Sequence, residues 1–159
     1  MRTLIALVLL MASAWVAAAP GEPLTSRMDV YRIEIADDGS ERAVAVEETL
    51  PGEVLEYRLR YENVSEQPLR ALVITGPVPA NTNYVGASAA TMVASSLQVS
   101  VDGGGSFEPE PVLRTRTRAD GSTQEYVVPP EQYTHVRWLS EQALAARTTQ
   151  EFRYRVVVE

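Results

Sequence analysis

The fold is decided by the stretch Glu53-Val54-Leu55-Glu56-Tyr57-Arg58-Leu59-Arg60-Tyr61-Glu62-Asn63. Apolar and charged residues alternate along it, and the apolar set is Leu55, Tyr57, Leu59 and Tyr61. A period of two places these side chains on one face of a β-strand and the charged side chains on the other. The stretch therefore predicts a strand with one buried face. Its outer face carries charges of both signs that can pair with a neighbouring strand.

The same alternation recurs in two other segments. In residues 30–36 it predicts that Tyr31, Ile33 and Ile35 point inward, and in residues 152–158 it predicts the same for Phe152, Tyr154, Val156 and Val158. Weaker strand candidates are residues 42–47, 70–75, 97–101, 112–117, 124–128 and 133–139, and Asp120-Gly121 predicts a hairpin turn. Residues 87–96 predict a loop or a short helix, and residues 140–147 predict a helix of one or two turns.

About seven to nine short strands separated by turn residues predict an all-β fold of two antiparallel sheets packed face to face. A closed barrel is the alternative architecture. We assign the sandwich to residues 28–159 and a flexible lead-in to residues 19–27, which contain Pro20, Gly21 and Pro23. Trp138 shares a strand face with Val136 and is predicted to anchor the core between the sheets.

Composition limits the chemistry that the chain can perform. It has 159 residues, no Cys, one His, and 14 basic against 21 acidic residues, which gives a formal net charge of −7. The length permits one ordinary domain. The lack of Cys excludes a disulfide framework and Cys-ligated zinc or iron–sulfur sites. The negative charge argues against a nucleic-acid partner, which needs a clustered basic surface. We expect no cofactor.

Residues 1–18 read as a secretory signal peptide. Arg2 precedes an apolar run over residues 4–10, and a stretch of small residues follows up to Ala18. This order is typical of an exported chain. The run is shorter than the roughly 20 residues that a membrane-spanning helix needs, so a permanent anchor is the weaker alternative. We expect a mature chain that begins at Ala19 and is free in the periplasm or secreted.

Several of these segments together resemble a known family. The segments are residues 51–63, residues 71–85, Ser100-Val101-Asp102-Gly103-Gly104 with Phe107, residues 134–138 and residues 152–158. Their order is similar to that of the domain-of-unknown-function-11 repeat family, which is marked by a Pro-Gly turn and an alternating strand that ends in Asn. Pro51, Gly52 and Asn63 match those marks.

The resemblance implies an exported immunoglobulin-like β-sandwich of bacteria or archaea, with no agreed activity. Members often stand in tandem on cell-surface proteins, whereas this chain carries one copy. Gly76-Pro77 also stands where the family usually has an acidic residue, which weakens any cation site taken from relatives.

Arg114, Arg116 and Arg118 alternate with Thr115 and Thr117 and predict a row of guanidinium groups on one strand face. Such a row can bind an anion or an acidic polysaccharide. The alternative is an edge strand that its charge protects from aggregation.

Asp102 and Gly104 belong to the stretch Ser100-Val101-Asp102-Gly103-Gly104-Gly105-Ser106-Phe107. It matches the Asp-box pattern and predicts a hairpin turn whose carboxylate accepts hydrogen bonds from the turn, with cation binding as the alternative. His135 has no nucleophile or acid beside it in the sequence and is predicted to lie on a solvated strand face.

The sequence thus predicts an exported, non-catalytic module that is protein-binding or structural in the bacterial cell envelope. We expect a monomer or weak oligomer that binds an envelope protein through Arg114, Arg116 and Arg118 or through the loop at residues 84–96. Two alternatives are a calcium-stabilised structural module and a protein that binds or hydrolyses a polysaccharide.

Overall fold

The computed structural model describes residues 21–159, and that range contains no α-helix. The predicted signal peptide and the first two residues of the predicted lead-in lie outside the described residues. The elements are β1 (Leu24–Ile35), β2 (Glu41–Ala45), β3 (Val54–Asn63), β4 (Val73–Pro77), β5 (Thr82–Tyr84), β6 (Ala90–Thr91), β7 (Ser95–Ser100), β8 (Glu108–Pro109), β9 (Leu113–Thr117), β10 (Thr123–Val127), the 3₁₀ helix η1 (Pro130–Gln132), β11 (His135–Ser140) and β12 (Thr149–Val158).

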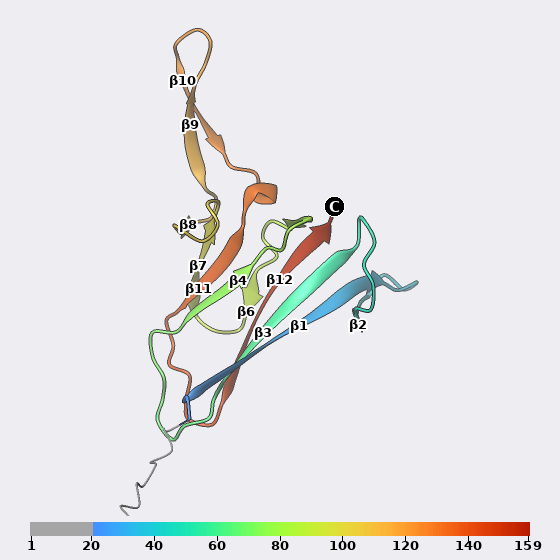
Figure 1. The fold of residues 1–159 in the computed structure, drawn as a ribbon, viewed down its shortest axis with the longest axis vertical. Helices are drawn as coiled ribbons and strands as arrows, with labels where there is room; N and C mark the ends of the chain where they lie inside the picture. Colours follow the sequence, from blue (N-terminus) through green and yellow to red (C-terminus); the bar gives the residue numbers. More distant parts are fainter. Residues whose placement is uncertain (1–20) are drawn as a thin grey trace, which may run out of the picture.

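Two antiparallel sheets make up the body of the molecule (Figure 1). The larger has the order β2-β1-β3-β12-β5, with β6 also paired to β12, and the smaller has the order β4-β11-β7-β8. β9 and β10 form a separate two-stranded ribbon that projects from the body. The predicted all-β fold with antiparallel sheets is confirmed, and two separate sheets are consistent with a β-sandwich.

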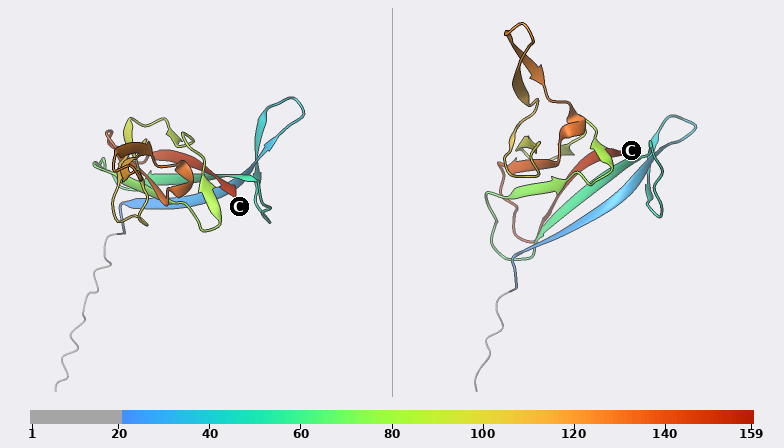
Figure 2. Two further views of the ribbon diagram at one scale, coloured as in Figure 1. Left: turned by 90° about the horizontal axis from the view of Figure 1, so that it is seen from above. Right: turned by 45° about the horizontal axis from the view of Figure 1, so that its top comes forward.

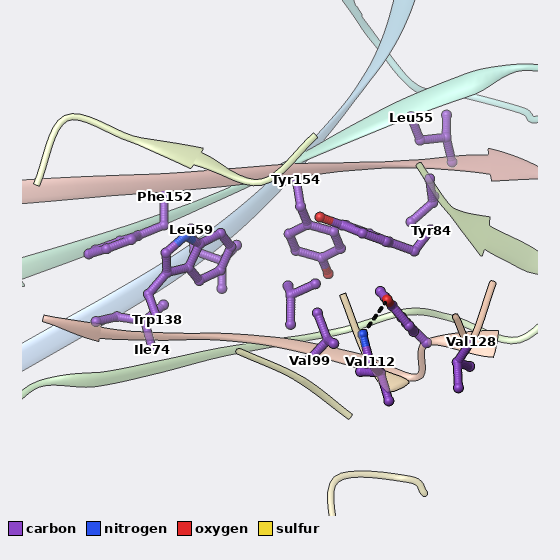
Figure 3. Close-up of a cluster of buried hydrophobic side chains, with 13 residues drawn as sticks. Leu55, Leu59, Ile74, Tyr84, Val99, Val112, Val128, Trp138, Phe152 and Tyr154 are labelled. Carbon is purple, nitrogen blue, oxygen red and sulfur yellow. Dashed lines mark hydrogen bonds between the residues drawn. The ribbon is translucent and has the colours of Figure 1, made fainter. Parts of the chain in front are cut away.

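The core lies between the two sheets. β3 is central in the larger sheet, between β1 and β12, and its Tyr57 ring stacks on Tyr154 of β12 with the ring centroids 5.1 Å apart. Trp138 of β11 approaches from the smaller sheet, with its ring centroid 5.5 Å from that of Phe152 (Figure 3). The buried apolar cluster is Leu55, Leu59, Ile74, Tyr84, Val99, Val112, Val128, Tyr133, Val136, Trp138, Phe152, Tyr154 and Val156.

The two sheets are in close contact at Gly76 of β4. A Cβ atom at this position would lie 2.5 Å from Cε1 of Tyr154, whose side chain is fully buried. The Tyr154 hydroxyl also donates a hydrogen bond to the carbonyl oxygen of Pro77. The tyrosine ring therefore fills the space that any side chain at position 76 needs, which gives a packing reason for glycine there.

β1 has the opposite phase to the one that the sequence predicts. Val30 pairs with Tyr57, and Tyr31 pairs with Glu56. Because paired residues share a face, Val30 faces the core and Tyr31 lies on the outer face, where the guanidinium of Arg58 is 4.5 Å from its ring centroid. The inward prediction for Tyr31, Ile33 and Ile35 is therefore wrong. Both faces of β1 carry apolar residues, so only its pairing with β3 decides the phase.

Four segments differ from their predicted structure in smaller ways. Residues 24–27, predicted as flexible lead-in, belong to β1 and pair with residues 60–63 of β3. Residues 87–96 contain no helix, and β6 within them pairs with β12. Ser140 ends β11, and residues 141–147 form bends, a turn and a single bridge rather than a helix. β4 begins at Val73 rather than at residue 70 and continues through Pro77 at the edge of its sheet.

Two of the residues predicted to be structural fix connections. Gly52 has a φ of +86°, and the amide of Glu53 donates to the carbonyl of Leu50, so residues 50–53 form a type II turn with Pro51 at its second position. Asn63 is fully buried at the end of β3. Its Nδ2 donates to the carbonyl oxygens of Gln67, Leu144 and Ala145, which ties two separate loops together.

Candidate functional site

The projecting ribbon of β9 and β10, residues 113–127, is the main candidate site, and we call it the arginine hairpin. Arg116 pairs with Gln124 in its ladder, and the tip closes through a hydrogen bond from the amide of Arg118 to the carbonyl of Ser122. Gly121 has a φ of +82°. The Asp120 carboxylate accepts hydrogen bonds from the hydroxyl and amide of Ser122, which hold its pKa below the ordinary value. The sequence therefore encodes the turn locally.

Three arginines share one face of the arginine hairpin, together with Gln124 and Tyr126 of β10. Arg114 bonds to both carboxylate oxygens of Glu108. Arg116 and Arg118 instead share one neutral acceptor, because the Oε1 atom of Gln124 lies 2.9 Å from Nη2 of Arg116 and 3.1 Å from Nε of Arg118. Arg116 also lies over the ring of Tyr126, 5.4 Å from its centroid. Neither Arg116 nor Arg118 has an ion-pair partner among residues 21–159.

The other face of the ribbon is also open to solvent. It carries Leu113, which is 47% exposed, and Val127, which is 53% exposed. Among residues 21–159, β9 and β10 pair only with each other, so the outer edge of each strand has unused backbone donors and acceptors. A ribbon of two strands is marginally stable on its own in water.

The body holds the base of this ribbon firmly. Val112 and Val128 flank the two strands, and both are buried in the core. The amide of Val128 donates to the carbonyl of Val112 over 2.8 Å, and the amide of Val112 lies 3.5 Å from the hydroxyl of Tyr133. A rigid base and an exposed ribbon are together typical of a contact element held out toward a partner.

The outer face of the larger sheet carries an ion network that the sequence predicts only as general cross-strand pairing. Glu56 is 2% exposed and accepts hydrogen bonds from Nε of Arg58 at 2.8 Å and from Nε of Arg155 at 2.9 Å. Arg155 also binds both oxygens of Glu41. Burial raises the pKa of Glu56, but the two guanidinium groups outweigh it and hold that pKa below the ordinary value. Each carboxylate oxygen of Glu56 has a guanidinium partner, so the network stabilises the outer face of the larger sheet.

Asp102 forms the predicted turn after β7. Its Oδ1 accepts hydrogen bonds from the Ser100 hydroxyl and the Ser106 amide, and its Oδ2 accepts one from the Ser106 hydroxyl. These bonds hold the pKa of Asp102 well below its usual range. Gly104 has a φ of +88°, and its amide donates to the Ser100 hydroxyl. The carboxylate is thus occupied by the turn.

His135 and Arg137 lie on the outer face of β11. The Nδ1 atom of His135 lies 3.2 Å from Oγ1 of Thr134, and its ring meets that of Phe107 edge-on. The guanidinium of Arg137 covers the same Phe107 ring, 3.3 Å from the centroid. The predicted site residues therefore fall in separate places, with the arginine hairpin, the Asp102 turn and the core Trp138 on different parts of the fold.

Within residues 21–159, no group of three or more His, Asp or Glu side chains is arranged to hold a metal ion. The same residues contain no helix of the length and apolar character that crossing a membrane requires. The geometry defines an all-β chain of two antiparallel sheets with one projecting ribbon. Comparison with family models, curated proteins and solved structures finds no match for this chain.

Proposed function

We propose that this chain is an exported, non-catalytic β-sandwich module that binds a protein partner in the cell envelope through the arginine hairpin. One observation carries the proposal: Arg116 and Arg118 project on a two-stranded ribbon whose base is buried, and they share a single neutral acceptor. Two guanidinium groups held side by side without a counter-charge favour an anionic partner, because each can form paired hydrogen bonds with a carboxylate.

The ribbon supports a protein partner better than a small molecule. Its strand edges have free backbone groups that can pair with a strand of another chain, and its apolar side chains Leu113 and Val127 are exposed on the opposite face. A small ligand instead favours a concave pocket that surrounds it. A projecting ribbon offers edges and two faces, which suit an extended protein surface.

An immunoglobulin-like architecture and membership of the domain-of-unknown-function-11 repeat family are part of this proposal. In their favour are the antiparallel sheets, the Pro51-Gly52 turn before β3 and the buried Asn63 at its end. The strand order differs from the constant-type immunoglobulin arrangement, because β12 pairs with β3 rather than with β11. Export rests on the signal-peptide pattern of residues 1–18.

A capture experiment with a charge reversal tests the binding role. The purified chain, immobilised, is incubated with an envelope extract, and each captured protein is then purified and its binding measured. We expect one defined protein whose affinity falls by about tenfold or more in the double variant Arg116→Glu, Arg118→Glu, because this variant replaces attraction with repulsion.

The matched control is the double variant Arg27→Glu, Arg70→Glu, which makes the same change in net charge at exposed positions on other parts of the chain. It should bind like the unmodified chain. Equal binding by the hairpin variant and the unmodified chain would overturn the proposed contact surface. Turnover of an envelope polysaccharide by the purified chain would overturn the non-catalytic role.

A further inference from the structure

A second ribbon, formed by the paired parts of β1 and β2 with the loop between them (residues 31–45), carries the opposite charge to the arginine hairpin. Beside it lies a hollow of about 560 Å³ that we call the acidic hollow. The hollow is lined by Arg32, Glu34, Val44, Ala45, Glu47 and Glu48. Arg32 is paired with Glu34 and Glu53, whereas Glu47 and Glu48 have no ion-pair partner within the described part of the chain. The hollow therefore retains two free carboxylates.

The two charged surfaces of one molecule lie apart from each other. In Figure 1 and in the right view of Figure 2, the orange arginine hairpin and the blue ribbon of β1 and β2 project from different parts of the body. Within residues 21–159, Arg116 and Arg118 of the arginine hairpin form no ion pair with Glu47 or Glu48, which follow β2. Ion pairing between the arginine hairpin and the acidic hollow therefore requires two copies of the chain.

We propose that the partner of the arginine hairpin is a second copy of this chain, whose acidic hollow receives Arg116 and Arg118. This inference rests on the proposed function and adds the identity of the partner. The contact joins different surfaces of the two copies, so it is heterologous and leaves one hairpin and one hollow free for further copies.

Apolar contacts can add to the charge pairing in such an assembly. Leu113 and Val127 are exposed on the arginine hairpin, and Ile35 and Leu50 are exposed on the ribbon and connection beside the acidic hollow, at 67% and 64%. The net charge of −7 opposes association at long range. At physiological salt this repulsion is screened beyond about 8 Å, whereas ion pairs in contact are screened less.

Sedimentation velocity of the purified chain over a range of concentrations tests the inference. We expect reversible association by the unmodified chain and by the control Arg27→Glu, Arg70→Glu. The variants Arg116→Glu, Arg118→Glu and Glu47→Lys, Glu48→Lys should each require about tenfold or more protein to associate. All substituted side chains are exposed, and circular dichroism spectra verify that each variant keeps the fold.

A mixture of the two variants gives the sharpest result. One variant retains its acidic hollow and the other retains its arginine hairpin, so an equimolar mixture should regain association that neither shows alone. A chain that stays monomeric at the highest concentration, or a mixture that does not associate, overturns the second copy as partner. Capture of a different envelope protein that depends on Arg116 would then leave the proposed function standing. If the chain neither associates with itself nor captures an envelope protein through Arg116, both proposals are overturned.

Discussion

Replacing Gly76 by alanine tests the contact that joins the two sheets. The new Cβ atom would lie 2.5 Å from Cε1, 3.0 Å from Cζ and 3.1 Å from the hydroxyl oxygen of Tyr154. Carbon atoms in favourable contact are about 3.5–4.0 Å apart, so the ring or the strand has to move by about 1 Å. The ring has little freedom to do so, because it is fully buried, stacks on Tyr57 and donates a hydrogen bond to Pro77.

We expect Gly76→Ala to lower the free energy of unfolding by about 2 kcal/mol, within the usual cost of overpacking a core. Urea unfolding followed by the fluorescence of Trp138 measures this change. Gly21→Ala is the matched control, since no atom lies within 4 Å of the added Cβ. In a Tyr154→Leu background, where the clashing ring is absent, Gly76→Ala should cost much less. A cost for Gly76→Ala of less than about 0.5 kcal/mol, the range of neutral surface changes, would refute the packing argument.

Two further substitutions test the outer network and the loop connection. Glu56→Gln should lower the free energy of unfolding, measured in urea, by about 2 kcal/mol. This cost is smaller than for a fully buried ion pair, because Arg58 and Arg155 are partly exposed. Glu62→Gln on the same face is the control and should leave the free energy of unfolding unchanged. Folding lowers the pKa of Glu56, so its contribution to the free energy of unfolding is complete above the ordinary pKa of 4.5. That contribution is lost as the pH falls through the lowered pKa of the folded state. The difference in stability between Glu56→Gln and the unmodified chain should therefore shrink in acid. Asn63→Ala should lower the free energy of unfolding by about 2–3 kcal/mol, because it leaves buried carbonyl groups without donors. An unfolding midpoint in urea equal to that of the unmodified chain would contradict this.

The alternation in β3 and β12 was sufficient to predict the core of the larger sheet. In both strands all the charged residues occupy one phase and all the aromatic residues the other, so burying the aromatic face is favourable and burying the opposite face is not. β1 has no such bias, because Val30 and Tyr31 on its opposite faces are both apolar or aromatic. Its phase depends on pairing with a strand more than 20 residues away, as in Val30 with Tyr57, which local pattern does not encode.

The candidate site was predictable as a row of charge but not as a projecting element. The spacing of Arg114, Arg116 and Arg118 predicts that they share a face. In the structure Arg114 and Arg116 lie on β9, Arg118 follows its last residue, and Arg116 and Arg118 share one acceptor. That β9 and β10 pair with no other strand of the described part of the chain depends on where Val112 and Val128 enter the core, which is a property of the whole fold. The burial of Glu56 likewise depends on Arg155, which is 99 residues away in sequence.

The position of β12 has a consequence for the order of assembly. It lies inside the larger sheet, paired on one side with β3 and on the other with β5 and β6, yet it comes from residues 149–158. During synthesis β3 ends at Asn63, and β12, one of its two neighbours in the sheet, begins only at Thr149, 86 positions later. Such distant pairing slows folding and delays completion of the larger sheet. A chain that crosses a membrane through a narrow translocation channel, as we propose for this one, benefits from that delay, because it reaches the far side before its sheets can close.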